Sequence, residues 1–147
     1  MVTITGTSGS LNHTATIALT ISSQGGTVTV TPVVSSDSPY YIEEDLKLAN
    51  TAPVTALSIT INVAVTPGLG INGEYNTVGG IITQADSSTA STLTYTYTLN
   101  PGQTLSAGSY LFAAQMSGTG TAHPVSGDTY SVTSTAGGTT TTQTGVF

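Results

Sequence analysis

The feature that most constrains the fold is a period-two alternation of apolar side chains with threonine or serine. Segment 57–65 is the clearest case, and segment 93–99 repeats the pattern with a threonine at every second position. Threonine occurs 31 times and serine 17 times, and β-branched threonine favours strands over helices. No segment has the apolar spacing of an amphipathic helix, so the pattern predicts an all-β protein.

Turn signals rich in glycine, proline, asparagine and serine separate roughly eight to ten short strands at intervals of about 8–12 residues. Because there are no helices to form crossovers, the strands must be antiparallel. We therefore predict an all-β fold, an antiparallel β-sandwich of immunoglobulin-like or jelly-roll-like type, with an N-terminal β-hairpin as an extension.

The division into domains follows from a glycine-rich break near residue 25. Residues 1–26 are predicted to be a hairpin and linker, with a turn at 7–10, and residues 27–147 form the sandwich module. The hairpin carries an apolar stripe, which consists of Val2, Ile4, Ile17, Leu19 and Ile21. This stripe is too small to be a core. It must dock on the sandwich, on an upstream domain or on another copy.

Within the sandwich module, segment 27–31 is a strand that Pro32 either ends or places at a sheet edge. Segment 41–48 alternates so that Glu44 shares the apolar face, whereas Glu43, Asp45 and Lys47 point away from it. Segment 57–65 is expected at the centre of a sheet. We expect a long loop up to Gly80, a short strand at 81–83, a glycine-rich loop at 118–127 and a closing hairpin.

The charge of the chain excludes several classes of function. It has one basic side chain, Lys47, against seven acids, for a net charge of −6. It therefore cannot neutralise a phosphate backbone or an anionic membrane surface, so we predict no nucleic-acid partner and no membrane partner. The absence of cysteine excludes disulfides and thiolate chemistry. A surface of hydroxyls suits export, and we expect a piece of a longer secreted or cell-surface protein.

Candidate catalytic residues are few, and we predict no enzyme activity. No Gly-x-Ser-x-Gly elbow is present, and the neighbouring acids at 43–45 are typical of a solvated strand face. His13 is expected to be solvated on its strand, whereas His123 lies in a loop that could face a ligand. No cofactor is predicted, except that Glu43, Asp45 and Asp128 could hold a calcium ion. The alternative is that these acids keep an edge strand soluble.

Three tyrosines are the best candidates for ligand contact. Tyr40, Tyr41 and Tyr75 lie beside polar turns or on an outward strand face, where an aromatic ring can stack on the apolar face of a sugar. Asn76, next to Tyr75, is included as a polar partner. The other strand aromatics, at 95, 97, 110 and 112, are predicted to be core residues.

From Pro39 to Phe147 the order of segments resembles the accessory modules of secreted bacterial hydrolases, including cellulose- and chitin-binding β-sandwich modules. The segments that carry this resemblance are PYYIEED at 39–45, NTAPVTAL at 50–57, YNTVGG at 75–80 and LNPGQTL at 99–105. The first 22 residues look like the closing hairpin of an immunoglobulin-like domain. Those modules usually present tryptophans, and this chain has none, so tyrosine would take their place.

The resemblance implies a non-catalytic, carbohydrate-binding accessory module that tethers a secreted enzyme to a polysaccharide such as cellulose or chitin. The alternative is a structural or adhesive surface module, in which residues 1–26 dock on another copy and build a filament by strand addition. The first function requires an exposed aromatic platform. The second requires an N-terminal strand that completes another sheet.

Overall fold

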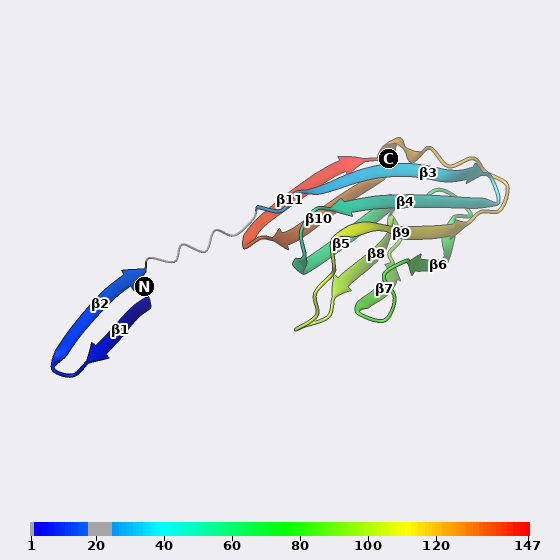
Figure 1. The fold of residues 1–147 in the computed structure, drawn as a ribbon. Helices are drawn as coiled ribbons and strands as arrows, with labels where there is room; N and C mark the ends of the chain where they lie inside the picture. The colour runs from blue at the N-terminus through cyan, green and yellow to red at the C-terminus, as the bar shows by residue number, and fades with distance from the viewer. Residues whose placement is uncertain (1, 18–24) are drawn as a thin grey trace.

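The chain folds into a two-sheet antiparallel β-sandwich preceded by a β-hairpin (Figure 1). The structure, a computed structural model, describes residues 2–17 and 25–147. The hairpin consists of β1 (Val2–Ser8) and β2 (Leu11–Ile17), which pair with each other and with no other strand among these residues. The predicted fold class is confirmed. Leu19 and Ile21 of the apolar stripe lie outside the described residues.

One sheet has the order β11-β10-β5-β8-β7. Its strands are β5 (Val54–Ala64), β7 (Ile82–Ser88), β8 (Thr92–Leu99), β10 (Thr129–Ala136) and β11 (Thr139–Val146). The other sheet has the order β3-β4-β9-β6. Its strands are β3 (Val28–Ser38), β4 (Tyr41–Asn50), β6 (Gly70–Asn76) and β9 (Gly108–Ser117). A single 3-10 turn, η1 (Val125–Gly127), interrupts the connection from β9 to β10.

Strand β5 occupies the central position predicted for it, between β10 and β8. Its apolar residues face the other sheet, and Ile59 and Ile61 have no exposed surface. Strand β3 lies at a sheet edge, so of the two predicted effects of Pro32, an edge position and the end of the strand, the first is confirmed. It continues through Pro32, and the register with β4 shifts between Val34 and Ser36. An edge strand tolerates both irregularities because one side of its backbone needs no partner.

Two sequence-based assignments were wrong. The segment before Gly80 was predicted to be a loop, but residues 70–76 form β6, which pairs with β9 through a register shift between Ile71 and Gly73. The strand predicted at 81–83 extends to Ser88 as β7. Strands β6 and β7 each pair with a long, regular neighbour. This pairing stabilises an extended backbone in segments whose own apolar alternation is weak.

Buried side chains from both sheets form one core. Tyr97 packs edge-on against Phe112 with ring centroids 5.3 Å apart. The hydroxyls of Tyr95 and Tyr97 donate to the carbonyls of Gln115 and Ala113 on β9, at 2.8 and 2.6 Å. These bonds satisfy the only polar atoms of two fully buried rings, so the two sheets are tied by hydrogen bonds as well as by packing. None of the helical segments described is long and apolar enough to cross a membrane.

Candidate functional site

The outer face of the four-stranded sheet carries a group of polar and aromatic side chains, one of them exposed and three half-buried. We call Tyr41, Glu43, Tyr75 and Gln115 the tyrosine cluster. Glu43 on β4 pairs in register with Gln115 on β9, and Tyr75 on β6 pairs with Ala113, two residues from Gln115. Because outward positions alternate along each strand, three strands bring these side chains together on one face.

A single carboxylate organises the tyrosine cluster. Glu43 accepts hydrogen bonds from the Tyr41 hydroxyl, from the Tyr75 hydroxyl at 3.3 Å and from Gln115 Nε2 at 2.9 Å. The bond from Tyr41 lowers the pKa of Glu43, and the bonds from Gln115 and Tyr75 act in the same direction. Burial and the neighbouring Glu43 raise the pKa of Tyr41 to about 12. At neutral pH the cluster is therefore one carboxylate held by two phenols.

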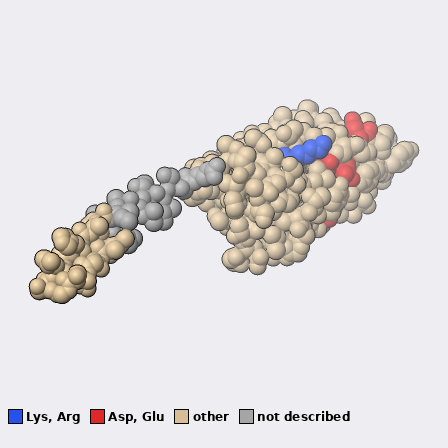
Figure 2. Space-filling model, viewed as in Figure 1, with Lys and Arg blue, Asp and Glu red and all other residues tan. Residues whose placement is uncertain are grey.

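The same face continues along the sheet past the sole basic side chain. Asp45 accepts a hydrogen bond from Ser35, and Lys47 is exposed on the same face two residues further along β4. Figure 2 shows the basic side chain close to acidic ones on a surface that is otherwise almost uncharged. Beyond Lys47 lies a shallow groove. Its lining includes Thr29, Thr31, Ala49, Thr77, Ser109 and Leu111. This groove extends the face with hydroxyl and apolar groups.

Two other predicted ligand residues lie outside the tyrosine cluster. Tyr40 is 69% exposed in the turn from β3 to β4, beside Gly120 of the glycine-rich loop. Asn76 ends β6, where its Oδ1 accepts the backbone N–H groups of Val78 and Gly79 and its Nδ2 donates to Gln84. The side chain of Asn76 therefore stabilises the turn after β6, and its hydrogen-bonding groups already have partners within the chain.

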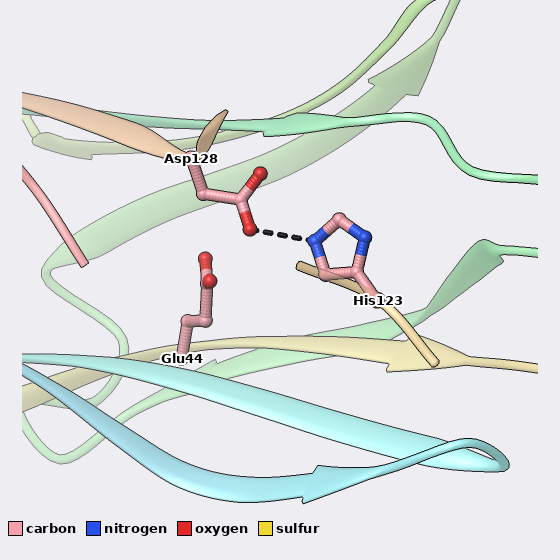
Figure 3. Close-up of side chains that lie close together, drawn as sticks. All are labelled: Glu44, His123 and Asp128. Carbon is pink, nitrogen blue, oxygen red and sulfur yellow. Dashed lines mark hydrogen bonds and ion pairs between the residues drawn. The ribbon is translucent and has the colours of Figure 1, made fainter. Parts of the chain in front are cut away.

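His123 lies in the loop between β9 and β10, as expected, but its side chain is 3% exposed and is not open to a ligand at the surface. It lies with Asp128 and Glu44, both with 0% exposure, and we call these three residues the buried triad (Figure 3). The structure does not bring Glu43, Asp45 and Asp128 together as a calcium site, because Glu43 is on the outer face. Glu44 was missed as a site residue, although the alternation of β4 had placed it on the apolar face.

Three elements position the buried triad. His123 Nε2 lies 2.6 Å from Asp128 Oδ2, and His123 Nδ1 lies 3.3 Å from the Thr66 hydroxyl. Asp128 Oδ1 accepts the Ala64 N–H at 2.7 Å. Glu44 extends from β4 toward both residues (Figure 3), and neither of its carboxylate oxygens has a hydrogen-bond partner among the described residues. Burial, followed by the proximity of Asp128, raises the pKa of Glu44.

No protein-family profile matches the chain, and no curated protein matches its sequence. Among solved structures, a cohesin module from a family 33 glycoside hydrolase of Clostridium perfringens aligns with a TM-score of 0.50 at 11% identity, over 82% of this chain and 93% of that module. A chitin-binding domain of a Pyrococcus furiosus chitinase aligns at 0.38 and 14%, over 86% of this chain and 98% of that domain. A carbohydrate-binding CBM3a module from a Clostridium thermocellum scaffoldin aligns with a TM-score of 0.37 at 14% identity, over 83% of this chain and 91% of that module.

The cohesin alignment shows a shared fold and nothing finer, since identity this low does not carry function. The fold is an antiparallel β-sandwich, as the sequence resemblance implied.

Proposed function

We propose that the chain is a non-catalytic carbohydrate-binding module that tethers a secreted enzyme to a polysaccharide, and that the outer face of the four-stranded sheet binds the glycan. The observation that carries this proposal is the tyrosine cluster, in which two phenol rings are fixed by one carboxylate on an open sheet face. Tyr75 is 38% exposed, so part of its ring can contact a sugar. Aromatic rings bind the apolar faces of sugars, while carboxylate and amide groups bind the hydroxyls.

The opposite outer face of the sandwich supports this choice. Its outward residues on β8, β10 and β11 are almost all threonine or serine, and several pair across strands, such as Thr133 with Thr142 and Thr135 with Thr140. No aromatic ring lies among the outward positions of these three strands. The four-stranded sheet is therefore the better candidate for an aromatic binding face.

The state of Glu43 supports a role in binding rather than hydrolysis. A glycosidase needs one carboxyl group with a raised pKa to protonate the leaving oxygen. The hydrogen bonds to Glu43 lower its pKa instead, which favours a permanent acceptor for sugar hydroxyls. We expect no turnover of glycoside, ester or peptide substrates.

The test is a pull-down of the purified chain on insoluble cellulose, chitin and xylan. Tyr75→Ala removes an exposed ring and is expected to weaken binding by about 1–3 kcal/mol, which is roughly 5- to 150-fold in Kd. Tyr75→Phe keeps the ring and loses only the hydrogen bond to Glu43, so it should retain most of the affinity. Thr144→Ala, on the outer face of the other sheet, is the control.

Binding of wild-type protein that Tyr75→Ala and Tyr41→Ala leave unchanged would place the glycan elsewhere. The failure of wild-type protein to bind any of the three polysaccharides would contradict the proposal for these ligands.

A second candidate function, self-assembly through the hairpin, is favoured by one observation. Ile4 and Leu11 are 55% and 65% exposed on two strands that pair only with each other in the described part of the chain. A hairpin with exposed apolar side chains is a potential partner for strand addition. Ordered polymers of the intact chain in negative-stain images would favour this function over glycan tethering.

A further inference from the structure

We propose that Glu44, His123 and Asp128 bind one divalent transition-metal ion, of which zinc is the type, and that this ion ties the loop between β9 and β10 to the inner face of β4. One ligand atom from each residue lies within 4.8 Å of the others. All three residues are buried, and Figure 3 shows both carboxylates and the imidazole directed at a common point. This site is on the opposite side of β4 from the tyrosine cluster and is independent of the glycan-binding proposal.

The unpartnered carboxylate of Glu44 is the first argument for a bound cation. Glu44 has 0% exposure, and both of its oxygens lack a hydrogen-bond donor among the described residues. A buried carboxylate without donors is costly, because it loses its hydration and gains nothing in return. A cation between Glu44 and Asp128 satisfies the free oxygens directly, and it removes the repulsion between the two carboxylates.

Charge balance is the second argument. Lys47 is the only basic side chain of the chain, and it is exposed on the outer face of β4. No lysine or arginine can therefore neutralise the two buried carboxylates. Metal ligands bind in their deprotonated form, so two carboxylates and a neutral imidazole would bring a charge of −2 to the ion, and one divalent ion would make the occupied site neutral. Buried charges in proteins are paired or coordinate metals.

The surroundings of His123 and Asp128 provide the third argument. His123 Nε2 lies 2.6 Å from Asp128 Oδ2 and Nδ1 lies 3.3 Å from the Thr66 hydroxyl, so Thr66 can accept from the Nδ1–H tautomer, which leaves Nε2 able to bind a metal. Asp128 is held from its other side by the Ala64 N–H. This is the arrangement of metal ligands oriented by outer hydrogen bonds, in which the second ring nitrogen of histidine and the second carboxylate oxygen each have a partner.

The donor set favours a transition metal over calcium. Calcium takes six to eight oxygen ligands, whereas zinc is satisfied by about four ligands and accepts imidazole nitrogen together with carboxylate oxygen. The buried triad supplies one nitrogen and three carboxylate oxygens, because Asp128 Oδ1 already accepts the Ala64 N–H. Its three residues come from β4, from the glycine-rich loop and from the residue before β10, so the ion would connect three segments distant in sequence.

The experiment uses the intact chain, stripped with a chelator and then titrated with zinc. Native mass spectrometry is expected to show one zinc per chain, and Tm should rise with zinc concentration because the ion binds the folded state. Cobalt in place of zinc should give the visible absorption bands of a low-symmetry site with nitrogen and oxygen ligands. The cobalt spectrum of the wild-type chain tests the site even if a core variant does not fold.

Two pairs of variants locate the ion. Glu44→Gln keeps the shape of the side chain and removes its charge, and it should weaken zinc binding at least tenfold, since even residues that only orient a ligand contribute 10- to 100-fold. Its control is Asp37→Asn, an exposed acid on β3. His123→Ala should abolish the cobalt bands, whereas His13→Ala, at the chain's other histidine, should leave them unchanged.

The absence of stoichiometric zinc binding to the wild-type chain would overturn the proposal. Loss of binding in His13→Ala together with full binding in Glu44→Gln would also overturn it, because the metal would then sit on the hairpin. In either case Glu44 and Asp128 would instead share a proton beside His123.

Discussion

Ile61 lies in β5, between Tyr95 on β8 and Tyr130 on β10, and none of its surface is exposed. Its neighbour Thr60 points to the outer face. Ile61→Ala leaves a cavity that rigid strands on both sides cannot close, and it should lower the free energy of unfolding by about 2–5 kcal/mol. Thr60→Ala should change it by less than about 0.5 kcal/mol. Urea denaturation of both variants measures the difference, and equal effects would mean that the register of β5 is wrong.

Glu74 gives the stability of the chain a pH dependence of known sign. Burial and the adjacent Asp86 raise the pKa of Glu74 above its ordinary value of 4.5. In the interval between the two pKa values the folded state binds more protons than the unfolded state, so the free energy of unfolding falls as pH rises through it. The contribution is fully favourable below pH 4.5 and is lost at higher pH.

Glu74→Gln removes this charge while keeping the shape of the side chain. We expect the variant to be more stable than wild type by up to about 0.5 kcal/mol at pH 8, since the pair is partly solvated. At pH 3 the difference should vanish, because Glu74 is then protonated in both states of the wild-type chain. Thermal unfolding at the two pH values measures the effect, and a variant less stable than wild type at pH 8 would refute the repulsion from Asp86.

Single residues show where local pattern is informative and where it is not. The alternation along 41–48 placed Glu44 with the apolar residues, and the structure buries it there. The burial of His123 could not be predicted, because its partners Thr66 and Asp128 are fixed by the packing of two strands against a loop. For the same reason the predicted calcium site was wrong: it combined Glu43, on the outer side of β4, with Asp128, which lies on the inner side.

At the scale of elements, strands with a regular apolar alternation were predictable and irregular ones were not. Strands β5 and β8 were recognised because an apolar residue recurs at every second position along segments 57–63 and 93–99. Strand β6 carries Gly70, Asn72 and Gly73 within seven residues, a composition typical of a loop. Its backbone is extended because β9 offers a ladder of hydrogen bonds, and that ladder is invisible in the sequence of β6 itself.

The turn between β3 and β4 fixes the glycine-rich loop. Gly118 donates its N–H to the Tyr40 carbonyl at 3.0 Å, and Gly120 donates to the Pro39 carbonyl at 2.9 Å. A Cβ atom at Gly118 would lie 2.3 Å from the Pro39 carbonyl oxygen, so any side chain there must displace backbone. We expect Gly118→Ala to destabilise the chain by about 1–3 kcal/mol.

Gly80→Ala is the matched control, since a Cβ atom at Gly80 meets nothing within 4 Å. It should change the free energy of unfolding by less than about 0.5 kcal/mol. Chemical denaturation of the two variants compares them, and equal stability would mean that the loop moves freely away from the β3–β4 turn.

For the whole molecule, composition and turn spacing were sufficient to predict an antiparallel sandwich, but not the order of its strands. The order depends on which edges meet in space, as when β10 returns to pair with β5 across a long stretch of sequence. The aromatic face could be predicted only in part. Tyr41 was placed on the outward face of its strand and Tyr75 in a loop, whereas their common partner Glu43 became apparent only when β4, β9 and β6 were placed side by side.

The organisation of the chain as hairpin plus sandwich leads to a prediction that separates the two proposed functions. Residues 25–147 contain the whole described core, and Thr27 is tied to Thr51 by backbone and side-chain hydrogen bonds, so the sandwich should fold without residues 1–24. If the chain is a glycan-binding module, the deletion should leave a monomer by size-exclusion chromatography with unchanged affinity for polysaccharide, because the tyrosine cluster lies entirely on β4, β6 and β9. If the chain assembles through the hairpin, the intact protein should form polymers that disappear on deletion, and Tyr75→Ala should not affect them. We expect the first result, and an unfolded truncated chain would instead show that the hairpin completes the core.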